Sequence, residues 1–218
     1  MKTVVYIDGQ NFLYKAADVL IEAGLIAEKQ ELHTISLRKL FETLLKEEGV
    51  EIRYYGTKLK KHKHTPEIEE KSRVMIDSQR RLKNSLAKQS IAFIDSGKLK
   101  VRDGDKCKVC GAQGLHFQEK GVDVKLAVDA VVDSLKGEVD RIILVSSDTD
   151  LLPAITTAKE NGTQVVYVGF SDKLTNALSI AASETQIIRD SEIVDAFNDA
   201  NQLQLKLVDN DDSKTDKS

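Results

Sequence analysis

The sequence has few cysteines and lacks any long apolar run, and both absences narrow its class. Two cysteines in 218 residues cannot form the dense disulfide framework of a small secreted protein, so we expect a reducing, cytoplasmic environment. No apolar stretch approaches the roughly 20 residues that cross a bilayer. The apolar part of the segment 1–8 is too short for a secretory signal. With 41% apolar and 31% charged residues, the chain has the composition of an ordinary soluble globular protein, neither disordered nor fibrous, and we expect no membrane partner.

Several common catalytic motifs are also missing. The chain contains neither the GxxxxGK[ST] loop nor a GxGxxG segment after a strand, so nucleotide binding by these loops is not expected. A GxSxG nucleophile turn is absent as well. Asp8 follows the first predicted strand, as the nucleophile of haloacid-dehalogenase phosphatases does, but those enzymes carry a second aspartate two residues later. This chain has Gln10 there, which argues against that class.

Short strand patterns alternate with helical patterns along the chain. We expect strands at Thr3–Ile7, Val50–Thr57, Ile91–Ile94, Arg141–Val145, Thr163–Val168 and the short run Ile187–Ile188. Helices are expected at Phe12–Ala23, between Ser36 and Gly49, at Pro66–Gln89, Val122–Leu135 and Leu151–Glu160, from about Lys173, and near Ile193–Phe197. This alternation predicts an α/β fold with a mainly parallel, Rossmann-like sheet and helices on both faces.

The domain organisation is expected to be simple. Without an internal repeat or a clear linker, the chain should form one domain over residues 1–200. The segment Asp95–Gly97 predicts a tight turn back into Leu99–Arg102. Residues 201–218 are expected to be a disordered tail, because no apolar residue follows Val208.

Four aspartates occupy positions where a parallel sheet would gather them: Asp8, Asp123, Asp148 and Asp150. Asp8 directly follows the first strand, and Asp148 follows the strand Arg141–Val145 after two serines. In open α/β sheets the ligand crevice lies beyond the carboxyl ends of the strands. Taken singly, Asp123 could merely favour a helix start and Asp150 could cap a helix. Together the acids would repel each other, and Mg²⁺ or Mn²⁺ is the usual remedy. Such an ion suits hydrolysis of a phosphodiester.

Three short blocks carry a family resemblance. They are YIDGQN at Tyr6–Asn11, KGVDVKLAVD at Lys120–Asp129 and SSDTDLLP at Ser146–Pro153. Their order and spacing over roughly residues 3–190 resemble the NYN domain family (the LabA-like, DUF88 group) of the PIN-like nucleases. The resemblance implies a PIN-like, Rossmann-like fold and RNA cleavage with Mg²⁺ or Mn²⁺. The alternative is a non-catalytic PIN-like module that binds RNA or a protein in RNA metabolism or regulation.

The resemblance also implies roles for individual residues. The metal-site acids would be Asp8, Asp123, Asp148 and Asp150, and Asn11 would position a water or a phosphate, or orient Asp8. Three further residues are expected in supporting positions: Ser147, Lys120 and Asp129. Asp129 lies six residues beyond Asp123, about 240° around a helix, so the two cannot share one face. Lys120 is expected to pair with a carboxylate rather than to hold a phosphate.

A basic segment suggests a surface for RNA. Residues 51–110 hold 16 of the 32 Lys and Arg but 8 of the 35 Asp and Glu. The candidates for phosphate contacts are Arg53, Lys58, Lys60, Lys61, Lys63, Arg80 and Arg81. Single-stranded RNA is the expected partner, because Tyr54 or Tyr55 could stack on a base, although one of these tyrosines should face the core. The alternative is a solvated helix that is rich in lysine.

A small insertion at about 103–119 contains both cysteines. Cys107, Cys110 and His116 resemble part of a zinc knuckle, but a structural zinc site needs four ligands. The fourth ligand could come from His62, from His64 or from a partner chain, and a homo-oligomer is left open. A redox pair or two reduced thiols in a loop are the alternatives.

Overall fold

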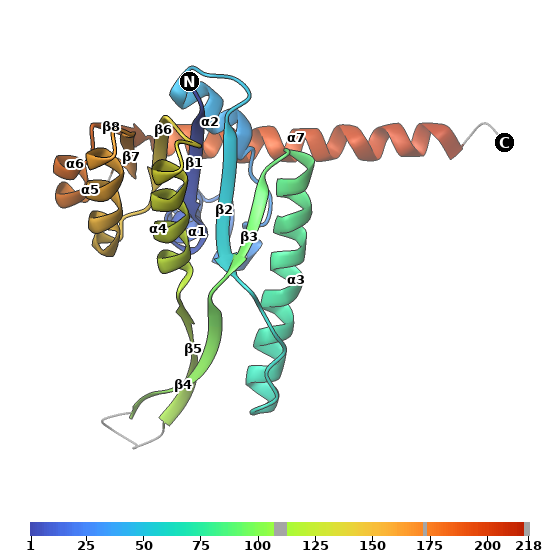
Figure 1. Cartoon of the computed structure of the whole chain (residues 1–218). Helices are drawn as coiled ribbons and strands as arrows, with labels where there is room; N and C mark the ends of the chain where they lie inside the picture. Colours follow the sequence, from blue (N-terminus) through green and yellow to red (C-terminus); the bar gives the residue numbers. More distant parts are fainter. Residues whose placement is uncertain (107–112, 172–173, 216–218) are drawn as a thin grey trace.

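The computed structural model describes residues 1–106, 113–171 and 174–215 (Figure 1). Its strands are β1 (Thr3–Asp8), β2 (Glu51–Thr57), β3 (Ala92–Ser96), β4 (Lys98–Lys106), β5 (Gln113–Lys120), β6 (Arg141–Val145), β7 (Gln164–Phe170) and β8 (Glu184–Ile188). Its helices are α1 (Gly9–Glu22), α2 (Leu37–Leu45), α3 (Pro66–Lys88), α4 (Val122–Leu135), α5 (Leu152–Glu160), α6 (Asn176–Ala181) and α7 (Asp190–Thr215). Two short 3-10 turns are η1 (Lys29–Glu31) and η2 (Thr149–Leu151).

Six strands form one parallel sheet in the order β3-β2-β1-β6-β7-β8. This confirms the expected α/β fold with a Rossmann-like sheet. The chain builds the sheet outward in one direction from β1 to β3 and in the other from β6 to β8. The strand order therefore reverses between β1 and β6, which is where such sheets form a crevice at their carboxyl edge.

Two apolar layers cover the faces of the sheet. Alternate residues of β1 point to opposite sides, so that Val5 and Ile7 belong to the core under α1, α2 and α7, whereas Val4 and Tyr6 belong to the core under α4, α5 and α6. All four side chains are fully buried. A strand that is covered on both faces needs apolar residues at every position, which explains why β1 was visible as a continuous apolar run.

The chain does not turn back after β3, so this expectation is wrong. Gly97 takes a positive φ of 66°, and β4 then leaves the central sheet and pairs antiparallel with β5. A Cβ at Gly97 would lie 2.5 Å from the carbonyl oxygen of Lys120, so only glycine fits where the two strands meet. Figure 1 shows this β4–β5 hairpin extending beyond the carboxyl edge of the sheet, beside the amino-terminal half of α3.

The last helix, α7, continues past the position where we expected the chain to become disordered. Its backbone is helical from Asp190 to Thr215, and its first part buries Ile193, Ala196 and Ala200. The disordered tail expected at 201–218 stays a prediction. Among the helices described, none is both long and apolar enough to cross a membrane.

The junction between β1 and α1 leads to a prediction about packing. A Cβ on Gly9 would lie 2.2 Å from Cε1 of Tyr54 and 2.4 Å from the carbonyl oxygen of Tyr55. Because the backbone of β2 cannot move aside easily, Gly9→Ala should lower the free energy of unfolding by about 1–3 kcal/mol, measured by urea denaturation. Gln10→Ala, at the exposed next position, should change it by less than about 0.5 kcal/mol. Equal losses in the two variants would contradict the close packing.

Candidate active site

Asp8 ends β1 at the carboxyl edge of the sheet and is buried. Its Oδ1 accepts a hydrogen bond from the backbone N–H of Asn11 at 3.1 Å, and its Oδ2 accepts one from the hydroxyl of Ser146 at 3.0 Å. Burial raises the pKa of the Asp8 carboxyl above its usual value. The two hydrogen bonds oppose that rise, and the negative charges of Asp148 and Asp123 add to it.

Asp148 is tied to Asp8 through Ser146. The backbone N–H of Asp148 donates to the Ser146 hydroxyl at 3.1 Å, while that hydroxyl donates to Asp8. The Oδ1 atom of Asp148 then caps η2 by accepting a hydrogen bond from the backbone N–H of Asp150 at 2.9 Å. A single serine thus links the acid that ends β1 to the acid that follows β6. The sequence patterns drew attention to Ser147 and missed this role of Ser146.

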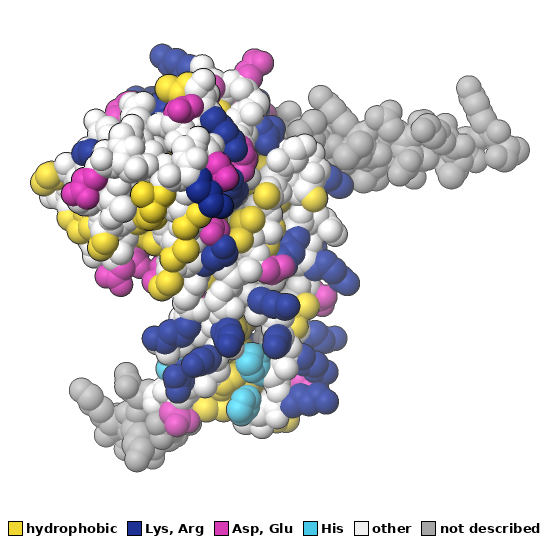
Figure 2. Space-filling view, viewed as in Figure 1, with side chains coloured by type: hydrophobic (Ala, Val, Ile, Leu, Met, Phe, Trp, Pro, Cys, Tyr) yellow, Lys and Arg dark blue, Asp and Glu magenta, His cyan; other side chains and the backbone are white. Residues whose placement is uncertain are grey.

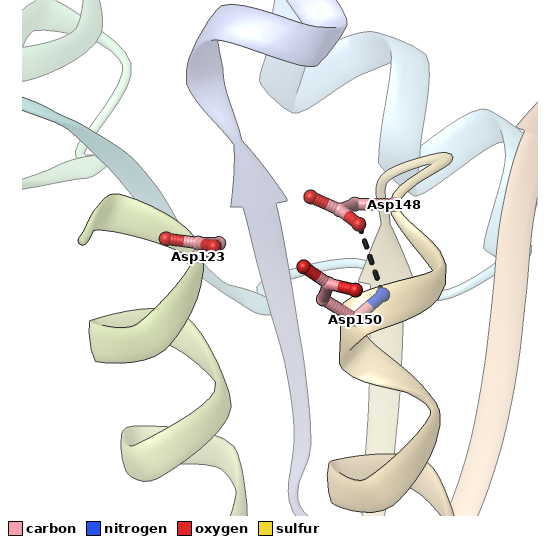
Figure 3. A group of neighbouring side chains, drawn as sticks. All are labelled: Asp123, Asp148 and Asp150. Atoms are coloured by element: carbon pink, nitrogen blue, oxygen red, sulfur yellow. Dashed lines mark hydrogen bonds between the residues drawn. The ribbon is translucent and has the colours of Figure 1, made fainter. Parts of the chain in front are cut away.

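Asp123, Asp148 and Asp150 form a compact group of carboxylates. One oxygen from each lies within 4.8 Å of one oxygen of each other. Figure 3 shows the three side chains directed toward a common space, from α4 on one side and from the segment around η2 on the other. Asp123 and Asp148 are half-buried and Asp150 is exposed. Asp8 lines the same cavity of about 460 Å³ as Asp123 and Asp148. The structure therefore brings all four predicted acids together.

Glu119 is a further acid of this cavity that the sequence patterns missed. It is carried there by β5 and lines the cavity beside Asp8 and Asp123. The hydroxyl of Thr57 donates a hydrogen bond to its carboxylate. Burial raises the pKa of Glu119, the hydrogen bond opposes the rise, and the charges of Asp8 and Asp123 add to it. Its position next to the KGVD block was the one available signal in the sequence.

The donor set has a clear chemical preference. Every acid in the group offers carboxylate oxygen, and neither histidine nor cysteine lies among the described residues that line the cavity. Oxygen ligands of this kind suit hard divalent cations such as Mg²⁺ and Mn²⁺. The residues therefore fit a metal of that class.

Comparison with known protein families tests the family membership that the three sequence motifs suggested. The model of the NYN domain matches residues 2–190. The chain belongs to the NYN domain family. This is a family of PIN-like nucleases, and its nucleases generally depend on divalent metal.

Two curated relatives match this NYN domain in short segments, and the chain covers less than a quarter of the length of each. A stretch of 57 residues is 42% identical to a protein of Methanocaldococcus jannaschii that is described as uncharacterized, covering 26% of this chain and 24% of that protein. A stretch of 43 residues is 44% identical to the 6-hydroxy-3-succinoylpyridine 3-monooxygenase of Pseudomonas putida, covering 20% of this chain and 14% of that protein. A crystal structure of a protein of unknown function from Vibrio parahaemolyticus is similar with a TM-score of 0.52 at 18% identity, over 86% of this chain and 92% of that one. This last likeness supports the fold alone.

Asn11 holds the loop after β6 of the NYN domain. Its side-chain Nδ2 donates to the hydroxyl of Ser147 at 2.8 Å, and its Oδ1 accepts from the backbone N–H of Ser147 at 3.2 Å. Its backbone N–H supports Asp8. Of the roles expected for Asn11, orienting Asp8 is the one that these contacts favour, through the backbone rather than the amide.

Of the two predicted supporting residues Lys120 and Asp129, Lys120 lines the cavity and Asp129 does not. Lys120 is exposed and lines the cavity, and no carboxylate of the described residues forms an ion pair with it, so the expected pairing is not seen. Asp129 pairs with Lys125 and accepts a hydrogen bond from the buried hydroxyl of Tyr55 at 3.0 Å. It lies outside the residues that line the cavity and supports the fold instead.

Arg53 is half-buried and its charge is paired, whereas we expected it to be free for contacts with RNA. Its guanidinium pairs with Glu51 and Asp133 and lies over the ring of Tyr6 at 5.4 Å. The prediction that Tyr54 or Tyr55 stacks on an RNA base is also wrong. Tyr54 is 2% and Tyr55 0% exposed, because they lie in the cores on opposite faces of the sheet, and neither ring can receive a base.

The other basic candidates lie at the surface. Lys58, Lys60, Lys63 and Arg81 are exposed, and none forms an ion pair within the part of the chain that is described. Lys61 pairs with Glu69, and Arg80 pairs with Asp77. Figure 2 shows Lys and Arg side chains gathered over α3 and over the β4–β5 hairpin beside it.

The expected zinc site stays a prediction. Cys107 and Cys110 lie outside the described residues, in the connection between β4 and β5. His116 is exposed on β5. His62 contacts the rings of His64 and Phe117, with centroid separations of 6.2 and 5.5 Å.

Asp148→Asn tests whether the acids share a cation. Without divalent ions the variant should be at least as stable as the wild type, because one of several repelling charges is lost while the oxygen that caps η2 is kept. Millimolar Mn²⁺ should raise the melting temperature of the wild type, since the ion binds the folded state, and this rise should largely disappear in the variant. Asp129→Asn, on the same helix as Asp123 but outside the cavity, is the matched control and should keep the rise. A full Mn²⁺ response in Asp148→Asn would count against the shared site.

Glu119→Gln tests the charge balance of the cavity through pH. Burial raises the pKa of Glu119 in the folded protein. The wild type therefore loses stability as the pH rises from the ordinary glutamate pKa of about 4.3 through the raised pKa of the folded state. Glutamine has no charge to bury, so the variant does not lose stability in this way. The variant should therefore gain stability over the wild type at about pH 8, and the gain should vanish near about pH 4. Urea denaturation in EDTA across this range measures it, with Glu48→Gln as the control at an exposed glutamate. A difference that does not change with pH would disprove the burial effect.

Proposed function

We propose that this NYN domain is a divalent-metal-dependent ribonuclease that hydrolyses RNA phosphodiester bonds at its cluster of aspartates. The observation that carries the proposal is the group of carboxylate oxygens from Asp123, Asp148 and Asp150 within 4.8 Å of one another, beside the buried Asp8. Membership of a PIN-like nuclease family supports the reaction class. RNA as substrate follows from what the family implies.

The proposed roles follow from the positions of the acids. Asp123, Asp148 and Asp150 would hold Mg²⁺ or Mn²⁺. When bound, the ion would supply a more acidic water and stabilise charge on a phosphoryl oxygen. Asp8, held by Asn11 and Ser146, and Glu119, held by Thr57, lie beside this group and would be the proton acceptors. Ser146 would keep Asp8 and Asp148 at a fixed separation during the reaction.

The surroundings of the cavity supply the attraction that phosphates need. An acidic cavity repels RNA unless positive charge lies nearby. Lys120 at the cavity itself, with Lys58, Lys60 and Lys63 on the loop after β2, provides such charge. We propose that these lysines and Arg81 contact the RNA backbone without reading its sequence.

Cleavage of labelled single-stranded RNA tests the function directly. The wild type should cleave with Mn²⁺ or Mg²⁺ and stop when EDTA is added. Asp123→Asn and Asp148→Asn should each lower the rate by roughly two orders of magnitude, as expected when one preorganised electrostatic group is lost. Asp129→Asn should cleave at the wild-type rate per folded molecule. If the wild type binds RNA but cleaves with neither ion, the domain is a binding module and the nuclease proposal fails.

A further inference from the structure

The β4–β5 hairpin has one strongly basic face. Side chains on a strand alternate between its two faces, so Lys98, Lys100 and Arg102 of β4 lie on the same side. The strand register places them opposite Lys120, Gln118 and His116 of β5, respectively. These six positions carry four permanent cations and no carboxylate. The four cations are all exposed.

The opposite face of the hairpin is mainly apolar, with Glu119 and Asp103 at its two ends. It is packed against the rest of the domain, which fixes the orientation of the basic face. Leu99, Val101, Leu115 and Phe117 lie on that side and are partly buried. Leu99 lines a cavity between the hairpin, α1 and α3. The ring of Phe117 packs against His62 with a centroid separation of 5.5 Å. The hairpin therefore cannot turn its basic face inward without exposing this apolar side.

Repulsion among the cations of the basic face destabilises the hairpin when no anionic ligand is bound. Lys98 lies directly opposite Lys120 in the register, and like charges in a cross-strand pair destabilise a hairpin. Among the described residues, no carboxylate forms an ion pair with any of the four cations of this face. On the neighbouring α3, Arg73, Arg80 and Lys83 are each paired with an acid, whereas Arg81 forms no ion pair with a described residue. An anionic ligand would supply the missing negative charge.

The row of cations begins at the proposed catalytic cavity. Lys120 lines that cavity with Asp123, and Lys98, Lys100 and Arg102 continue outward along β4. Residues two apart on an antiparallel strand are separated by about 6.8 Å, which is comparable to the distance between successive phosphates of an extended single strand. Figure 2 shows Lys and Arg side chains covering the hairpin on the face turned to the viewer.

We propose that this basic face of the β4–β5 hairpin binds the phosphate backbone of a single RNA strand and leads that strand to the acidic cavity. The identity of the ligand rests on the proposed function, whereas the need for a polyanion rests on the unpaired row of cations. The face adds Lys98, Lys100 and Arg102 to the residues that contact RNA. It also defines a path for the RNA, which would run along β4 from Arg102 to Lys98 and then past Lys120 into the cavity.

The test uses the full chain with Lys98, Lys100 and Arg102 all changed to Gln. A second triple variant, Lys46→Gln, Lys88→Gln and Lys136→Gln, is the matched control. It removes the same number of charges from exposed lysines that precede β2, β3 and β6 at the other edge of the sheet. Fluorescence anisotropy with a labelled single-stranded RNA, in EDTA and at increasing salt, gives the affinity and its salt dependence for each protein.

The hairpin variant should bind the RNA at least about tenfold more weakly at moderate salt. The slope of log affinity against log salt should become shallower by about 2, since each phosphate contact to a single strand contributes about 0.7. The control triple should keep the wild-type slope. Lys100→Gln alone, with an expected change of about 0.7 in the slope, repeats the test with one substitution if the triple variant does not fold.

Several outcomes would overturn the proposal. One is a hairpin variant that binds RNA like the control triple. Another is equally tight, hairpin-dependent binding of a duplex of the same sequence. A third is hairpin-dependent binding of phosphatidylserine vesicles without binding of RNA. RNA binding is measured without divalent ions and therefore independently of cleavage. If binding depends on the hairpin but the wild type does not cleave RNA, the nuclease proposal is wrong and the proposal for the hairpin surface is kept. If cleavage depends on Asp148 but the hairpin variant binds RNA as the wild type does, the nuclease proposal is kept and the proposal for the hairpin surface is wrong.

Discussion

The parallel pairing of β1 with β6 is the constraint on which the site depends. The register places Ile7 beside Val145, so the residues that come next in the chain, Asp8 and Ser146, emerge at the same edge of the sheet. The hydroxyl of Ser146 can then bind Asp8 while it accepts the N–H of Asp148. A shift of this register by one residue would separate these groups and turn the apolar side chains of β1 to the wrong faces. The packing of the core and the geometry of the acids therefore have the same origin.

The fold reduces, but does not remove, the repulsion among these acids. Asp8 caps α1, Asp123 lies in the first turn of α4, and Asp148 caps η2. At the amino-terminal ends of α1 and α4 the partial positive charge of the helix backbone stabilises an anion by about 0.3–1 kcal/mol. At the short η2 turn the support is the single hydrogen bond from the backbone N–H of Asp150 to Asp148. The raised pKa of Asp8 indicates that burial and neighbouring charge outweigh this help. A divalent cation would satisfy what the backbone leaves uncompensated.

Local sequence patterns predicted the parts of the structure that depend on local chemistry. The buried strands appeared as apolar runs, and Asp8 and Asp148 could be placed at strand ends because a parallel sheet aligns those ends. Long-range pairing was beyond such patterns. Arg53 looked like a surface cation, but pairing of β2 with β1 sets it beside Tyr6 and within reach of Asp133. Glu119 was missed for the same reason, because only the pairing of β4 with β5 brings it to the cavity.

The acidic cavity and the basic hairpin meet where β5 ends, since Lys120 and Asp123 are three residues apart and line the same cavity. In the proposed nuclease this proximity couples the two ligands. A cation bound among the aspartates lowers the negative charge that a phosphate meets, and a phosphate beside Lys120 in turn favours the cation, because coupling between two binding sites is reciprocal. The acids alone would repel the substrate, and the hairpin alone would hold RNA without cleaving it. In the proposed nuclease, their placement at one strand end would let metal and RNA each strengthen the binding of the other.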